Sequence, residues 1–144
     1  MTISNQFKVI GFTASAFDLL HSGHVAMLKE AKDQCDWLIC GLHVDPSKER
    51  HGKNKPIQSI VERYIQLESN CYVDQIIPYE TEKDLIDILL TVHIDVRIIG
   101  EDYLGMNYTG IGLIKTTYFN RRKHSFSSSN LRDRIKNNET IGRN

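Results

Sequence analysis

Short apolar runs alternate along the chain with stretches whose apolar residues recur every three or four positions. Continuous apolar runs are typical of buried strands, and periodic stretches are typical of amphipathic helices. Strands are predicted at Lys8–Thr13, Trp37–His43, Val73–Pro78, Val96–Gly100 and Lys115–Phe119, and helices at Gly23–Gln34, Ile57–Ser69, Thr81–Val92 and Ser127–Asn137. Because strands joined through helices usually pair in parallel, the pattern predicts an α/β protein: a five-stranded, mainly parallel sheet with helices on both faces.

Length and composition narrow this picture to one ordinary globular domain. The 144 residues are enough for a single hydrophobic core, and residues 137–144 are expected to fray. No apolar run approaches the ~20 residues of a membrane span, and the first residues lack the pattern of a signal peptide. Three cysteines, Cys35, Cys40 and Cys71, have no Cys-x-x-Cys spacing, so reduced thiols are expected. We therefore expect a cytoplasmic protein without a membrane partner.

The net charge of zero hides a basic C-terminal segment. Residues 121–144 contain seven Lys/Arg and two Asp/Glu. Such a segment could bind nucleic acid or be a solvated helix face. Few charges are present and no aromatic side chains alternate with them, so a small anionic ligand such as a triphosphate explains the segment better than nucleic acid does.

Two histidines lie where the first strand gives way to the first helix. His21 and His24 are three residues apart, so they share one face of that helix, and Gly23 leaves room between them. A helix N-terminus attracts anions, so the pair is suited to phosphate groups. A metal pair completed by Asp18 is the alternative.

These histidines belong to a longer motif. The octapeptide Phe-Asp-Leu-Leu-His-Ser-Gly-His, residues 17–24, resembles the signature of the cytidylyltransferase-like nucleotidyltransferases. Further segments match that family in order and spacing: Lys53-Asn54-Lys55-Pro56, Arg63, Tyr72-Val73-Asp74, Gly100-Glu101-Asp102-Tyr103, and Arg122 followed by Phe126-Ser127-Ser128-Ser129. The resemblance covers roughly residues 8–136, and among small members the glycerol-3-phosphate cytidylyltransferases are the most similar.

The resemblance implies a Rossmann-like nucleotidyltransferase domain, commonly a homodimer. It would join a nucleoside monophosphate from CTP, bound with Mg²⁺, to a phosphorylated small molecule and release pyrophosphate. The implied catalytic residues are His21, His24, Lys55 (preferred to Lys53) and Arg122. Nucleotide contacts are implied for Ser15, Ala16, Phe17, Asp18, Lys53, Arg63, Gly100, Asp102, Phe126, Ser127 and Ser128. No metal ligand set within the protein is predicted.

The position of these residues supports the resemblance independently. The histidines, the basic Val44–Pro56 loop, the Gly-Glu-Asp-Tyr segment and the serines each follow a predicted strand. Ligands of open parallel sheets bind beyond the carboxyl ends of the strands, so all four segments are expected at one edge.

Three departures from the family pattern keep other functions open. Ser15-Ala16 stands where the family has Gly followed by Thr or Cys, Cys71 replaces an arginine of the glycerol-3-phosphate enzymes, and Thr109–Thr117 is short for a helix. The alternatives are an adenylyltransferase that uses ATP with a flavin or pantetheine phosphate, and a non-catalytic nucleotide-binding protein.

Overall fold

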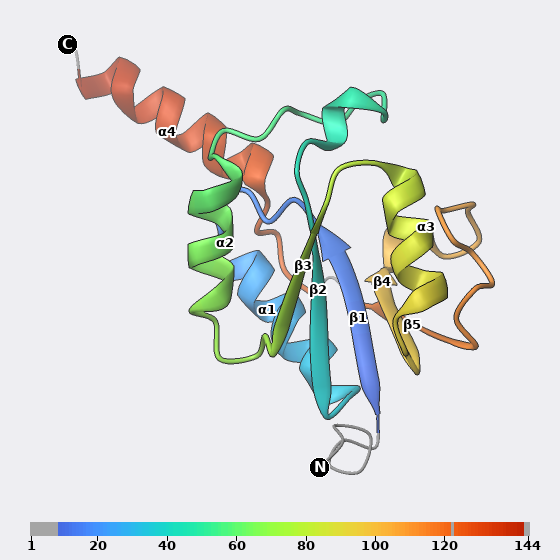
Figure 1. Cartoon of the computed structure of the whole chain (residues 1–144). Coiled ribbons are helices and arrows are strands. Elements are labelled where there is room, and N and C mark those ends of the chain that lie inside the picture. The colour runs from blue at the N-terminus through green and yellow to red at the C-terminus, as the bar shows by residue number, and fades with distance from the viewer. Residues whose placement is uncertain (1–8, 122, 143–144) are drawn as a thin grey trace.

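Five parallel strands form the sheet around which the chain is built. The computed structural model describes residues 9–121 and 123–142. The strands are β1 (Ile10–Ser15), β2 (Trp37–His43), β3 (Gln75–Tyr79), β4 (Val96–Gly100) and β5 (Thr116–Asn120). Their order is β3-β2-β1-β4-β5, with parallel pairing throughout (Figure 1). Successive strands are added on one side of β1 up to β3 and on its other side from β4 onwards. Open parallel sheets bind ligands at such a switch point, which here lies between β1 and β4.

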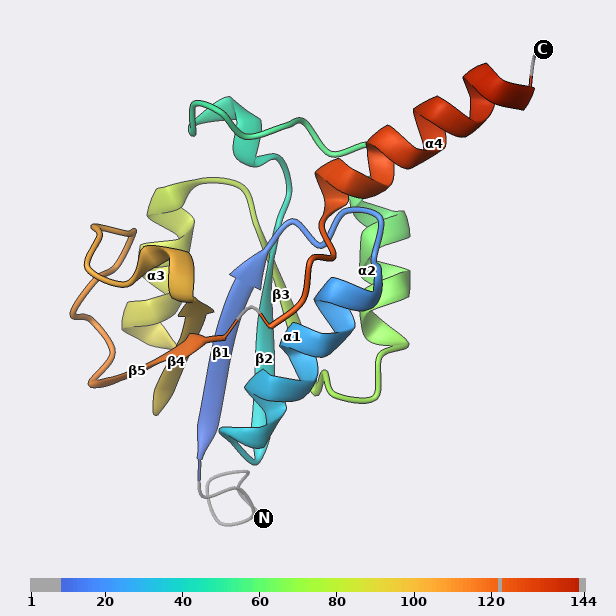
Figure 2. The same cartoon turned by 180° about the vertical axis from the view of Figure 1, so that it is seen from behind.

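Helices cover both faces of this sheet. The helices are α1 (Ser22–Asp33), α2 (Ile60–Glu68), α3 (Glu82–Thr91) and α4 (Ser128–Gly142), with short 3₁₀ turns η2 (Pro46–Lys48) and η3 (Glu101–Tyr103). Figures 1 and 2 show α1 and α2 on one face and α3 on the other, while α4 projects away from the sheet. The predicted α/β architecture is confirmed, and no helix in the described part of the chain is long and apolar enough to cross a membrane.

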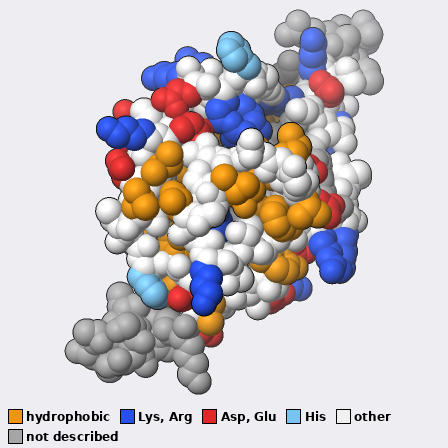
Figure 3. Space-filling view, turned by 90° about the vertical axis from the view of Figure 1, so that its right-hand side faces the viewer, with side chains coloured by type: hydrophobic (Ala, Val, Ile, Leu, Met, Phe, Trp, Pro, Cys, Tyr) orange, Lys and Arg blue, Asp and Glu red, His pale blue; other side chains and the backbone are white. Residues whose placement is uncertain are grey.

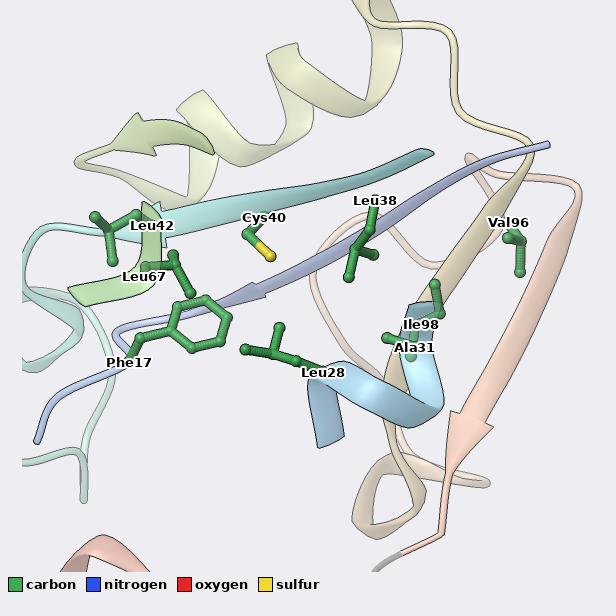
Figure 4. Packing of buried hydrophobic residues seen from close by; sticks show 9 residues of the cluster. All are labelled: Phe17, Leu28, Ala31, Leu38, Cys40, Leu42, Leu67, Val96 and Ile98. Atoms are coloured by element: carbon green, nitrogen blue, oxygen red, sulfur yellow. The ribbon is translucent and has the colours of Figure 1, made fainter. Parts of the chain in front are cut away.

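Two apolar clusters hold the layers together. On one face, Leu28 and Ala31 of α1 and Leu67 of α2 pack against Leu38 and Cys40 of β2 (Figure 4). The second cluster joins α3 to the other face of β1 and β2 and contains Phe12, Ile39, Tyr79, Leu85, Leu89 and Ile114. All three cysteines are free thiols; Cys40 is buried in the first cluster, whereas Cys71 is exposed.

Helix boundaries differ from the predicted ones where capping decides them. α2 begins at Ile60 rather than Ile57, because the Ser59 hydroxyl accepts the Glu62 N–H and the Glu62 carboxylate accepts the Ser59 N–H. This reciprocal capping box satisfies amides that the first turn of a helix leaves without partners. α4 continues to Gly142, beyond the predicted end at Asn137.

The segment between β4 and β5 takes the place of a helix on the α3 face. Apart from η3, residues 101–115 form turns, in which Gly105, Gly110 and Gly112 have positive φ. Gly110 also passes so close to α3 that a Cβ there would lie 2.4 Å from Cδ1 of Leu89. Apolar side chains are exposed on this face (Figure 3): Leu90, Leu104, Met106, Ile111 and Leu113.

A buried arginine ties the carboxyl ends of β1 and β2 to α2. The guanidinium of Arg63 is 2% exposed. It donates to the carbonyls of Ala16 and His43 at 3.0 and 2.7 Å, and to those of Val44 and Gln58 at 2.6 and 3.1 Å. Buried carbonyl groups need such partners, so Arg63 fixes the backbone around the edge where ligands are expected.

Replacement of this arginine is expected to destabilise the fold. Arg63→Met leaves four carbonyl groups without their donor, which should lower the free energy of unfolding by about 3 kcal/mol. Urea unfolding followed by circular dichroism measures this. The control, Arg134→Met on the exposed face of α4, should change stability by less than about 0.5 kcal/mol. Equal stability of the two variants would contradict the role given to Arg63.

Candidate active site

The histidine pair lies at the sheet edge where helices α1 and α4 both begin. α1 starts directly after the loop that follows β1, and the first turn of α4 lies beside it (Figure 2). His24, Ser15, Lys53 and Ser128 line two adjoining cavities there, of about 350 and 570 Å³. The amino ends of two helices thus face the same space, which favours an anionic ligand.

Each histidine is held by a hydrogen bond to the backbone. Nδ1 of His21 accepts the Gly23 N–H at 3.0 Å, and Nδ1 of His24 accepts the His21 N–H at 3.2 Å. Together these bonds form a reciprocal cap of α1. A neutral imidazole carries one proton. Because both Nδ1 atoms accept, that proton is on Nε2 in each ring, where it can be donated to a ligand.

Gly23 is required for this packing. A Cβ on Gly23 would lie 2.8 Å from Cε1 of His21 and 3.1 Å from the Cβ of Phe126. The two imidazoles are 4.0 Å apart between ring centroids. Glycine at this position therefore leaves room for the His21 ring and for Phe126.

His24 is neutral at physiological pH. Burial and the neighbouring His21 lower the pKa of His24 to about 4, against an opposing effect of Asp18. Both causes disfavour the imidazolium form. The site thus offers His24 as an uncharged N–H donor.

The serines at the start of α4 complete the anion site. The Ser127 hydroxyl accepts the Asn130 N–H at 3.0 Å, so Ser127 caps the helix. The Ser128 hydroxyl lies 3.1 Å from Nε2 of His21. Ser128 and His21 are therefore directly hydrogen-bonded, and this bond joins the first turns of α1 and α4.

The Asp18 carboxylate is held by backbone N–H groups and by an arginine. Its carboxylate accepts the N–H groups of Ile57 and Gln58 at 2.9 and 3.0 Å and pairs with Arg132 of α4 at 2.7 Å. Although burial raises its pKa, these hydrogen bonds bring the pKa of Asp18 below its ordinary value. The carboxylate is thus engaged with three groups of the protein.

The predicted site residues fall into three groups. The larger cavity brings most of them together: Ser15, His21, His24, Lys53, Gly100, Asp102, Phe126, Ser127 and Ser128. The smaller cavity adds Ala16, Phe17 and Asp18, although the Phe17 ring itself is buried in the core. Lys55 is exposed and lines neither cavity, and Arg63 binds backbone carbonyls. Arg122 lies outside the described residues.

Arg132 lines the site although its sequence context did not predict a role for it. Its guanidinium lines the smaller cavity, and its Nε is buried without a partner among the described residues. The feature that could have identified it is its spacing from Ser128. Residues four apart on a helix share a face, and Arg132 follows Ser128 by four residues. Cys71, in contrast, lies in the connection from α2 to β3, at the amino ends of the strands and away from both cavities.

The described residues contain no group of three or more His, Cys, Asp or Glu side chains that could hold a metal ion.

Comparisons with known proteins identify the family of this chain. The cytidylyltransferase-like family model matches residues 12–134. The chain is 37% identical over 108 residues to the bifunctional protein HldE of Paramagnetospirillum magneticum, covering 74% of this chain and 22% of that protein. It is 35% identical over 133 residues to HldE of Helicobacter pylori, covering 92% of this chain and 28% of the relative. The chain thus spans less than a third of the length of either relative.

Solved structures show the same fold. The lipopolysaccharide core biosynthesis protein from Thermoplasma volcanium has a TM-score of 0.57 at 22% identity over 90% of this chain and 87% of that one. A proposed nicotinate-nucleotide adenylyltransferase from Vibrio parahaemolyticus has a TM-score of 0.56 at 13% identity over the same shares. Because the family model matches most of its length, we conclude that this chain belongs to the cytidylyltransferase-like family.

Proposed function

We propose that the protein transfers a nucleoside monophosphate from a nucleoside triphosphate to a phosphorylated small molecule. The observation that carries this proposal is the pair of imidazoles held by Nδ1 hydrogen bonds where α1 and α4 begin. An acceptor phosphate oxygen attacks the α-phosphorus, the bond from that phosphorus to the bridging oxygen breaks, and pyrophosphate leaves. The negative charge that develops on the phosphate oxygens is stabilised by N–H donors already in place.

Different residues of the proposed site bind different parts of the nucleoside triphosphate. His21 and His24 donate to the phosphates, while Ser128 and the first turn of α4 bind the distal phosphates. The nucleoside occupies the larger cavity beside Gly100 and Asp102. Mg²⁺ enters as the ion bound by the triphosphate, and the site is proposed to form within each subunit of a homodimer.

The nucleotide is proposed to be CTP or ATP. The choice of CTP and glycerol 3-phosphate rests on the resemblance of the motifs. The name of the HldE relatives mentions neither compound, and one structural neighbour is described as an adenylyltransferase. ATP with another phosphorylated acceptor is therefore carried as an equal candidate.

The proposal is tested first by nucleotide binding. We expect CTP or ATP, each with Mg²⁺, to raise the melting temperature of the protein more than GTP or UTP does, because ligands that bind only the folded state stabilise it. Pyrophosphate release is then measured with a panel of phosphorylated acceptors. Binding without release would favour a nucleotide sensor, and absence of any shift would contradict the proposed site.

The two loop lysines provide a matched pair. Because Lys53 lines both cavities and Lys55 lines neither, we now propose Lys53 as the lysine that contacts the phosphates. Lys53→Met should reduce kcat about 100-fold, as loss of one transition-state donor does. Lys55→Met should change kcat by less than about threefold. A larger loss of kcat in Lys55→Met than in Lys53→Met would restore the sequence-based preference for Lys55.

The low pKa of His24 predicts a pH dependence of stability. The folded-state pKa of about 4 lies below the ordinary value of 6.5, so the unfolded state binds more protons between these values. Stability due to neutral His24 is therefore complete above pH 6.5 and is lost as pH falls towards about 4. Urea unfolding should show that His24→Gln removes about 2 kcal/mol of this change. Parallel pH profiles for the two proteins would contradict the shifted pKa.

A further inference from the structure

A third cavity lies beside the histidine site, towards α3. Its volume is about 350 Å³, and it lies between β4, α3 and the 101–115 segment. It shares four lining residues with the smaller histidine cavity, namely Ala14, Arg50, Tyr79 and Tyr103. It contains neither histidine. A molecule in this cavity would therefore lie next to the proposed triphosphate site without occupying it.

The charge balance of this cavity is positive. Two arginines, Arg50 and Arg97, line it together with one carboxylate, that of Glu82. Glu82 influences both arginines through the electric field. Among the described residues, however, neither arginine has a carboxylate within ion-pair distance. One positive charge in the cavity lining thus remains without a counter-charge.

Burial of the positive charge is less favourable for Arg97 than for Arg50, which is only half-buried. Although it is only 6% exposed, its one hydrogen bond among the described residues is to the Thr109 carbonyl. Its guanidinium lies 5.0 Å from the centroid of the Tyr108 ring. A buried charge is unfavourable unless paired, and arginine is suited to carboxylate and phosphate because its N–H groups form a fork. An oxyanion in the cavity would offset this cost.

The other lining groups are suited to a hydroxylated molecule. Tyr103 accepts a hydrogen bond from Nη2 of Arg50 at 2.7 Å, which orients that guanidinium. Tyr79, Tyr108 and the Glu82 carboxylate add aromatic surface and a hydrogen-bond acceptor. A cationic or purely apolar ligand would leave the arginines without a counter-charge.

We propose that Arg97 and Arg50 form an oxyanion subsite that holds the acceptor substrate, a small hydroxylated molecule with a phosphate or carboxylate group. The identification of the bound molecule as the acceptor substrate rests on the proposed function, whereas the oxyanion site itself does not depend on it. Because Arg50 lines both cavities, it marks the path from this subsite to the histidines.

The test titrates inorganic phosphate and, separately, malonate into the protein, with sodium chloride at matched ionic strength as reference. Each titration is made with and without a saturating α,β-methylene analogue of CTP or ATP, so that the triphosphate site is filled in one arm. Melting temperatures give an apparent Kd for each anion. Preference for phosphate identifies the reacting phosphate as the bound group, and preference for malonate identifies a second, carboxylate group.

Variants separate this subsite from general charge effects. Arg97→Gln should weaken anion binding about tenfold, the scale of one lost charge-assisted hydrogen bond. Arg97→Lys, a second variant in case the glutamine variant folds poorly, keeps the charge but loses the fork of N–H groups, so it should bind the anion more tightly than Arg97→Gln and less tightly than the parent protein. Arg134→Gln on α4 is the matched control and should bind as the parent protein does.

The outcomes are distinct. Specific anion stabilisation that is lost in Arg97→Gln and kept in Arg134→Gln supports the subsite. No stabilisation beyond chloride, or equal stabilisation in both variants, overturns it. Failure of the nucleotide analogue to raise the melting temperature counts against the proposed function instead, and the arm without nucleotide still tests the subsite.

Discussion

The buried carboxylate of Asp18 is the interaction on which the geometry of the site depends. It binds the backbone N–H groups of residues 57 and 58 at the entry to α2, and it pairs with Arg132 of α4. α4 otherwise projects from the body of the protein (Figure 1). One charge therefore holds together the loop after β1, the end of the lysine-containing loop and the helix that brings Ser128 to His21. A carboxylate with these partners stays ionised at neutral pH, so the connection persists there.

The loop that presents Asp18 is strained, and its neighbours hold it. Phe17 and Leu19 have φ of 50° and 52°, in the left-handed region that residues with a Cβ seldom adopt. The Phe17 ring is fully packed in the core, and the Leu19 N–H donates to the Gln58 side chain at 2.7 Å. Arg63 binds the Ala16 carbonyl just before the strained pair. These contacts stabilise a turn that lets the chain leave β1, direct Asp18 inwards and begin α1 at the histidines.

The sequence predicted features that depend on neighbouring residues. Strand and helix patterns are local, and the three-residue spacing of His21 and His24 already defines their shared helix end. Contacts between distant segments were not predictable: Arg132 meets Asp18 across 114 positions, and Arg63 turns from the expected ligand to carbonyls of β1 and β2. Lys53 and Lys55 lie two residues apart in one loop, and the sequence-based preference for Lys55 could not take into account the path of that loop, which brings only Lys53 to the cavities. Arg97, on a strand read as buried, gave no sign that its charge would face a cavity.

The proposed reaction site presents a neutral donor, His24, whereas the proposed acceptor subsite presents a charged one, Arg97, and this difference has a chemical reason. At the proposed reacting phosphates, His24 is an uncharged donor, which contributes little to ground-state binding through charge. Its hydrogen bond strengthens as negative charge moves onto the leaving pyrophosphate, and only such differential binding accelerates the reaction. On the acceptor side, Arg97 is permanently charged and buried, so it binds an oxyanion equally before and during the reaction. Uniform binding of that kind does not lower the chemical barrier, but it holds the acceptor in position, and positioning is what a two-substrate phosphoryl transfer requires.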